Sequence, residues 1–116
     1  MSFPNTVARL VSAAGSNNAT LVSDKRTKLW RVTGYNAAAA VRYIKLFNLR
    51  VLPAPGTDTP FVTISLAPSA AFNIPFDGLT FQTGLGYGLV TGSADSDNTA
   101  VTAADIVGMN LLYESP

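Results

Sequence analysis

The chain contains no cysteine and no histidine. Without cysteine it cannot form disulfides or cysteine-based zinc sites, and its redox compartment is left open. Without histidine it lacks the commonest general base and metal ligand, together with every Ser-His or Cys-His catalytic arrangement. A hydrolase would have to rely on carboxylates, lysine or tyrosine, and the acids after residue 50 offer no recognisable acid–base pair. We therefore expect no enzyme activity, no catalytic residue, no cofactor and no metal site.

Long apolar runs are also missing, because no run approaches the roughly 20 residues that span a membrane. The start of the chain, MSFPNTVARLVSAAGS, is a poor signal peptide, since it lacks a basic beginning and Arg9 interrupts a short apolar stretch. We expect a chain made in the cytoplasm, without a membrane partner. Its 116 residues match the commonest domain size, which predicts a single domain over 1–116.

Charge is sparse and unevenly distributed. All eight bases lie in residues 1–50 beside a single acid, Asp24, and the other six acids follow residue 50. One interpretation is a basic face for an anionic partner, or a bipolar subunit whose two faces meet in a ring. The other is that the two halves interleave in one sheet system and their charges cancel locally.

Turn-forming residues recur every eight to twelve positions with short β-rich segments between them, which is typical of an antiparallel sandwich or barrel. We predict strands over 6–13, 19–23, 28–35, 41–52, 60–67, 71–75, 79–83, 85–91 and 106–113, with a turn at Asp77-Gly78. Residues 36–40 (NAAAA) are too few to form an independent helix, so we expect a tight corner there. Residues 97–108 should form a loop with at most one helical turn.

Several predicted strands alternate with period two. Val62, Ile64 and Leu66 share one face, and Val107, Met109, Leu111 and Tyr113 share another. In GLGYGLV, Leu85, Tyr87 and Leu89 oppose Gly84, Gly86 and Gly88. A row of glycines on one strand face lets another backbone or an aromatic ring approach closely.

Three motifs that could carry chemistry have weak patterns. Asp95 and Asp97 offer oxygen ligands for calcium, but Ala100 and Ile106 occupy the positions where an EF-hand needs glycine and glutamate. The glycines at 84–92 do not match a nucleotide-binding fingerprint. The segment DKRTKLWR surrounds Trp30 with bases, as in some nucleic-acid modules, although a solvated hairpin explains it as well.

A family resemblance extends over about residues 28–113. GYNAAAAVRYIKLFN, the GTDTP turn at 56–60, FQTGLGY at 81–87 and the acidic loop at 95–99 resemble small virion structural proteins of tailed bacteriophages and prophages. The resemblance implies an all-β, jelly-roll-like antiparallel sandwich of about eight strands on the virion exterior. It favours a capsid cement or decoration protein that clamps neighbouring major capsid proteins, expected to be a homotrimer, with no nucleic-acid partner and no small-molecule ligand.

Residues for partner contact follow from this interpretation. The strand at 41–52 mixes apolar and basic side chains on both faces, as expected where core lies on one side and a partner on the other. The candidate contact residues are Trp30, Arg42, Tyr43, Lys45 and Arg50, with Arg9 as a further charge partner. The alternative is a carbohydrate- or receptor-binding module of a tail fibre or spike, in which Trp30, Tyr35 and Tyr87 would line one groove.

Overall fold

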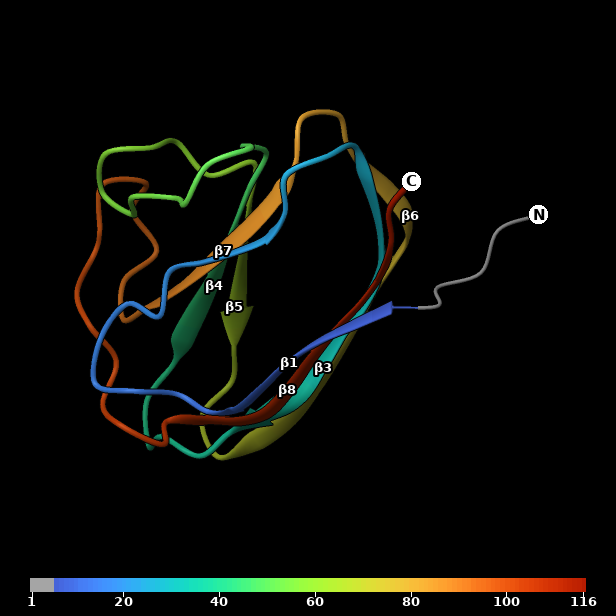
Figure 1. Cartoon of the computed structure of the whole chain (residues 1–116). Helices are drawn as coiled ribbons and strands as arrows, with labels where there is room; N and C mark the ends of the chain where they lie inside the picture. Colours follow the sequence, from blue (N-terminus) through green and yellow to red (C-terminus); the bar gives the residue numbers. More distant parts are fainter. Residues whose placement is uncertain (1–5) are drawn as a thin grey trace.

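A computed structural model of the protein describes residues 6–116. These residues form eight β-strands in two layers (Figure 1) and no helix, so this part of the chain has no helix long and apolar enough to cross a membrane. The strands are β1 (Thr6–Ser12), β2 (Thr20–Ser23), β3 (Thr27–Asn36), β4 (Arg42–Phe47), β5 (Val62–Leu66), β6 (Ala70–Phe81), β7 (Leu85–Val90) and β8 (Ile106–Glu114).

Each layer is a four-stranded antiparallel sheet. The β1 sheet has the order β1-β8-β3-β6, and the β2 sheet has the order β2-β7-β4-β5. β1 pairs with β8, β2 with β7, β3 with β6 and β4 with β5, as when one long hairpin is folded across itself. Eight strands arranged in this way form a jelly roll. The predicted all-β, jelly-roll-like sandwich of about eight strands is therefore confirmed.

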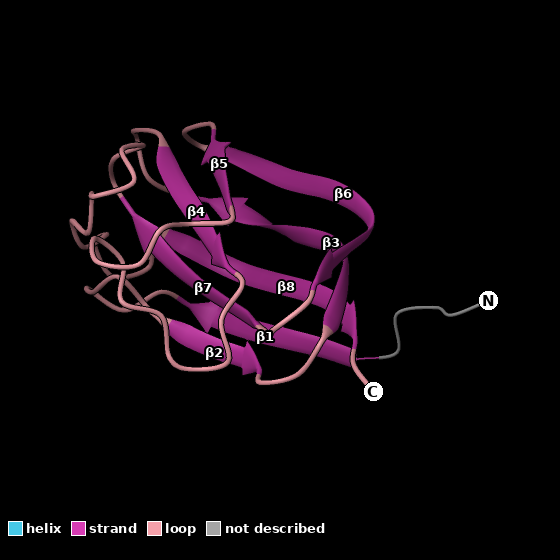
Figure 2. Cartoon of the chain, turned by 90° about the horizontal axis from the view of Figure 1, so that it is seen from above, coloured by secondary structure: helices cyan, strands magenta, loops and turns pink. Residues whose placement is uncertain are grey.

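Apolar side chains from both sheets fill the space between the layers seen in Figure 2. Leu29, Ile44, Leu89 and Leu111 have no exposed surface, and each such side chain contributes about 1.5–3 kcal/mol of burial free energy. The predicted inward faces of β5 and β7 belong to this core or pack against it. The period-two pattern thus identified correctly which side of each strand faces the core.

The prediction of a chain reversal at Asp77-Gly78 was wrong. Both residues have the positive φ angles that such a turn requires, 53° and 87°. The chain nevertheless continues as the single strand β6, because pairing with β3 resumes beyond them and residues 76–78 bulge opposite Trp30. The predicted strands 71–75 and 79–83 are therefore two halves of one strand.

A second bulge changes the inward face of β8. Met109 and Leu111 are fully buried and Tyr113 packs against the core, as predicted. Gly108 has a φ of 58° and lies where the register between β3 and β8 shifts. The alternation of inward and outward side chains along β8 therefore moves by one residue there. Ile106 is consequently buried in place of Val107.

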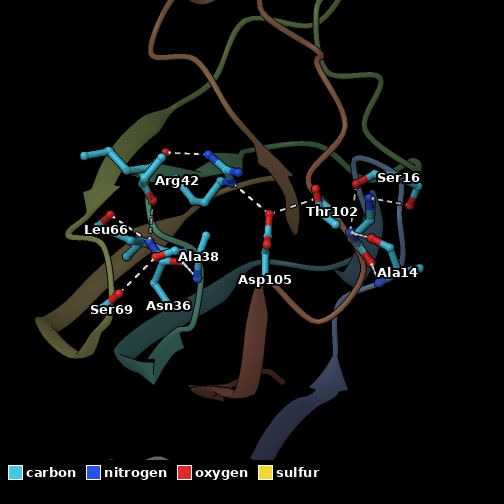
Figure 3. A network of polar contacts seen from close by, with 12 residues as sticks. Ala14, Ser16, Asn36, Ala38, Arg42, Leu66, Ser69, Thr102 and Asp105 are labelled. Atoms are coloured by element: carbon cyan, nitrogen blue, oxygen red, sulfur yellow. Dashed lines mark hydrogen bonds and ion pairs between the residues drawn. The ribbon is translucent and has the colours of Figure 1, made fainter.

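The corner at 36–40 forms as predicted, and its centre is a buried asparagine. The Asn36 amide group donates to the carbonyls of Ala40, Leu66 and Ala67, each at 3.1 Å, and its oxygen accepts from the Ala38 amide at 3.0 Å (Figure 3). The strand after the corner is shorter than the predicted 41–52, since the chain leaves the sheet after Phe47. Residues 97–105 contain turns and no helix, which confirms the loop predicted there.

Candidate functional site

The outer face of the β2 sheet is covered by the loop that joins β4 and β5. A Cβ added at Gly86 would lie 2.9 Å from Pro53, and one added at Gly88 would lie 2.8 Å from Pro55. At Gly84 it would meet the carbonyl oxygens of Leu49 and Ser23. The glycine face of β7 therefore receives backbone and proline rings at close range, as its sequence predicts.

The loop between β7 and β8 covers the same sheet and is held by Lys45. The side chain of Lys45 is 0% exposed, and its ammonium group donates to the carbonyls of Ala94, Asp95 (3.4 Å) and Asp97 (2.8 Å). The expectation that Lys45 touches a partner does not fit this burial. A buried ammonium group needs hydrogen-bond acceptors, and the loop supplies them, so Lys45 makes its contacts within its own chain.

The same loop contains the acids considered for calcium. The Asp97 carboxylate accepts from the Thr99 amide at 2.8 Å, and a side chain at Gly92 would collide with that carboxylate. Within residues 6–116, no group of three or more acidic, histidine or cysteine side chains could hold a metal ion. The cation that this loop surrounds is the ammonium of Lys45.

Arg42, the first residue of β4, forms an ion pair with Asp105, the residue before β8. Its Nε lies 2.9 Å from Oδ2 of Asp105, and the two side chains are 16% and 11% exposed. The same oxygen accepts from the Thr102 amide at 2.8 Å (Figure 3). Arg42 therefore ties the turn before β8 to β4, with only a small part of its surface left for a partner.

The other three candidate contact residues lie apart from one another. Tyr43 is half-buried and points outward from β4, next to the inward Ile44. Arg50 is exposed in the β4–β5 loop, beside Val51 and Leu52, which are 61% and 62% exposed. Trp30 lies in the other sheet, where its ring covers Gly78 and its Nε1 is buried without a hydrogen-bond partner. The five predicted residues thus do not form one surface.

The outer face of the β1 sheet is covered by no described segment (Figure 1). Antiparallel pairing aligns outward side chains in rows across the strands. One row is Val7, Leu112, Arg31 and Pro75; the next is Arg9, Asn110, Thr33 and Asn73; the third contains Val107, Tyr35 and Ala71. Val11, which alternates with the inward Leu10, completes the surface that we call the outer face. Among the residues predicted for partner contact on the cement interpretation, only Arg9 belongs to this face, although the alternation of Val7, Arg9 and Val11 with Ala8 and Leu10 is visible in the sequence.

The charges are divided between the two sides of the sandwich. The β1 sheet and the β2–β3 turn carry five bases and three acids; β4 and the two covering loops carry three bases and four acids. The two halves of the sequence do interleave, since β1 and β3 lie between or beside β6 and β8. Their charges cancel only in part, because Arg42 and Lys45 are used internally while the bases of the β1 sheet point outward.

A shallow hollow of about 280 Å³ lies at one end of the β1 sheet. It is lined by Arg26, Lys28, Glu114, Ser115 and Pro116. Lys28 and Glu114 are cross-strand neighbours on β3 and β8, and the Arg26 side chain donates to the amide oxygen of Gln82 at 3.3 Å. The hollow therefore has charges of both signs.

The chain matches no protein-family model, and no curated protein matches its sequence. Among solved structures, the coat protein of tobacco streak virus is similar over 100% of this chain and 91% of that chain, with 16% sequence identity and a TM-score of 0.37. A likeness at this level carries no argument about function.

Proposed function

We propose that the chain is a non-enzymatic virion structural protein, and specifically a capsid cement or decoration protein of a tailed phage. In this role it binds neighbouring major capsid proteins on the outside of the head and stabilises the shell after synthesis in the host cytoplasm. The observation that carries the proposal is the strand order β1-β8-β3-β6 and β2-β7-β4-β5. It is the jelly-roll arrangement found repeatedly in viral capsid domains.

The charged side chains support a role through contact. Asp105 holds Arg42, Asp97 caps the turn at Thr99, and Lys45 binds three carbonyls. Asp58 accepts from the Ala54 amide at 2.8 Å and so fixes the β4–β5 loop. Groups that an enzyme would direct into a cleft here hold loops against a sheet.

Jelly rolls also serve as lectin domains, and the carbohydrate-binding alternative requires Trp30, Tyr35 and Tyr87 to share one groove. Tyr87 is 4% exposed and belongs to the core, whereas Tyr35 is 40% exposed on the outer face. Trp30, Tyr35 and Tyr87 therefore do not line the single groove that this alternative requires. No other feature of the described residues favours it over a protein-binding role.

The homotrimer and the contacts of Trp30, Arg42, Tyr43 and Arg50 remain part of this proposal. Arg50 is the best placed of the four, since the loop that carries it is anchored on β7 and exposes two aliphatic neighbours. Association into a trimer would multiply a modest contact with the shell by engaging three sites at once.

The direct test has two measurements. The first is the mass of the purified protein in solution by light scattering. The second is co-sedimentation with undecorated heads assembled from the major capsid protein of the genome that encodes this chain. A discrete trimer that saturates the heads at a fixed ratio and delays their thermal rupture is expected. A protein that ignores the heads at every concentration would refute the cement role.

A further inference from the structure

We propose that the outer face of the β1 sheet is the main docking surface, and that it fits an acidic protein surface on the partner. This inference rests on the proposed virion function and assigns the contact to a different part of the molecule from β4. The two outer faces of the sandwich differ in how far the chain's own loops cover them. Its own loops cover the β2 sheet, whereas the β1 sheet has an exposed face of outward side chains.

Neither arginine of the outer face forms an ion pair within residues 6–116, and the acids of the same sheet, Asp77 and Glu114, lie outside the three rows. Arg9 is exposed, and no hydrogen bond or ion pair involves its side chain within residues 6–116. Arg31 donates to the Asn73 amide oxygen, an uncharged acceptor. None of the three rows contains a carboxylate. Two guanidinium groups therefore remain available for carboxylates of a partner, with which they can form bidentate contacts.

Aliphatic side chains surround these arginines. Val7 and Val11 flank Arg9 on β1 and are 56% and 64% exposed, and Tyr35 lies two strands away. Protein–protein interfaces have a similar composition, in which arginine and tyrosine are enriched among apolar side chains. A nucleic-acid surface would need more bases for phosphate contact, and a small ligand would need a concave site. The hollow of about 280 Å³ lies away from the three rows, at the Lys28 end of the sheet.

The same charges argue against a second copy bound through the same face. A two-fold interface would place two copies of the same arginine-bearing, carboxylate-free surface against each other, and such like-charge juxtaposition is costly. A partner that presents carboxylates avoids this cost. Charge complementarity thus selects an acidic surface as the occupant.

The size of the face sets the strength of one contact. Four strands spaced about 4.8 Å apart, with about 3.3 Å per residue along the seven residues of β1, give a projected area on the order of 450 Å². A standard stable interface buries about 800 Å² on each partner. One copy should therefore bind weakly, and stable attachment requires several copies acting together, as on a repeating shell.

The test uses charge and polarity changes on β1 with a matched control. Arg9→Glu reverses the exposed guanidinium, and Val11→Asp places a carboxylate on the apolar part of the same face. Lys25→Glu makes a similar charge change at an exposed position of the β2–β3 turn. All three variants should keep the urea midpoint of the wild type, because Arg9, Val11 and Lys25 neither belong to the hydrophobic core nor pack against it. Co-sedimentation with the undecorated heads described above is then measured at 50 and 200 mM NaCl.

We expect Arg9→Glu and Val11→Asp each to weaken head binding at least tenfold, while Lys25→Glu changes it less than twofold. Wild-type affinity should also fall with salt, and that fall should be smaller for Arg9→Glu. If the wild type binds heads and both β1 variants bind equally well, the assignment of this face is wrong while the cement role stands. If the wild type does not bind heads, the proposed function itself fails.

Two further readouts identify other occupants of the face. Light scattering of Arg9→Glu in the absence of heads would show a reduced mass if a second copy occupied the face, and that result overturns the inference. Double-stranded DNA binding by the wild type that is lost in Arg9→Glu would overturn it in favour of nucleic acid. An unchanged mass and no DNA binding, combined with lost head binding, support the acidic protein partner.

Discussion

Replacing Lys45 by methionine should reduce the free energy of unfolding by about 2–4 kcal/mol. Methionine keeps most of the apolar stem and creates little empty volume, so the change isolates the ammonium group. A hydrogen bond to a charged group contributes about 1.5–3 kcal/mol, and Lys45 donates to three carbonyls. Ala94 and Asp95 are exposed, so water can replace part of what they lose, which keeps the total below a simple sum.

A competing effect works in the opposite direction. Replacing a buried charged pair by apolar residues can be neutral or stabilising, because the desolvation cost of the ions disappears. Here only the donor is removed and the backbone carbonyls stay in place, so the loss of hydrogen bonds should dominate. The sign of the change in unfolding free energy therefore shows which is larger, the loss of hydrogen bonds or the relief of the desolvation cost.

Urea unfolding of Lys45→Met is compared with that of Lys25→Met, which removes an exposed lysine and should change stability by less than about 0.5 kcal/mol. Hydrogen exchange should show the loss first in the 94–99 loop, before the amides of β4. If the urea midpoint of Lys45→Met matches the control, or rises, the loop is not held by this side chain and the reasoning fails.

The remaining predictions concern the fold. Asn36→Ala removes four hydrogen bonds at the β3–β4 corner and should lower the free energy of unfolding by about 2–4 kcal/mol in urea titrations; a loss under 0.5 kcal/mol would contradict the role of this amide. Gly84→Ala places a Cβ against backbone carbonyls and should cost about 1–3 kcal/mol, whereas Gly15→Ala, whose added Cβ meets nothing closer than 3.8 Å, serves as the matched control and should leave the midpoint nearly unchanged. Leu89→Ala should cost about 2–5 kcal/mol by opening a cavity in the core, and equal stability of this variant would show that the core repacks.

The strands that the sequence located best are those in which apolar residues alternate with polar residues or glycine and whose own backbone has no bulge. In β5 and β7 the apolar residues alternate without interruption, and the structure buries the predicted side of each. Two of the errors occur at bulges. Asp77-Gly78 has the chemistry of a hairpin turn, and only the continued pairing of β3 with both halves of β6 shows that the chain does not reverse. That information is nonlocal, so no window of the sequence contains it.

The contact residues were harder to predict for a related reason. Arg42 and Lys45 look like exposed bases on a half-buried strand. The sequence does not show that Asp105 contacts Arg42, or that carbonyls of residues 94–97 contact Lys45, from 49 or more residues later in the chain. A base on a strand is available to a partner only if no loop of the same chain reaches it. Arg9 meets that condition and was given only a minor role.

The glycines at 84, 86 and 88 explain why a loop can cover the outer face of the β2 sheet. Side chains at Gly84, Gly86 and Gly88 would keep the β4–β5 loop at a distance, and the prolines at 53 and 55 could not pack on the strand. With glycine at all three positions the loop covers the β2 sheet, and the carbonyls of the β7–β8 loop occupy Lys45. The bases in the middle of the β2 sheet are thus withdrawn from the surface, while those of the β1 sheet are not. The glycines therefore let the β4–β5 loop lie on the β2 sheet, while contacts with the segment between β7 and β8 withdraw Lys45 and Arg42 from a partner.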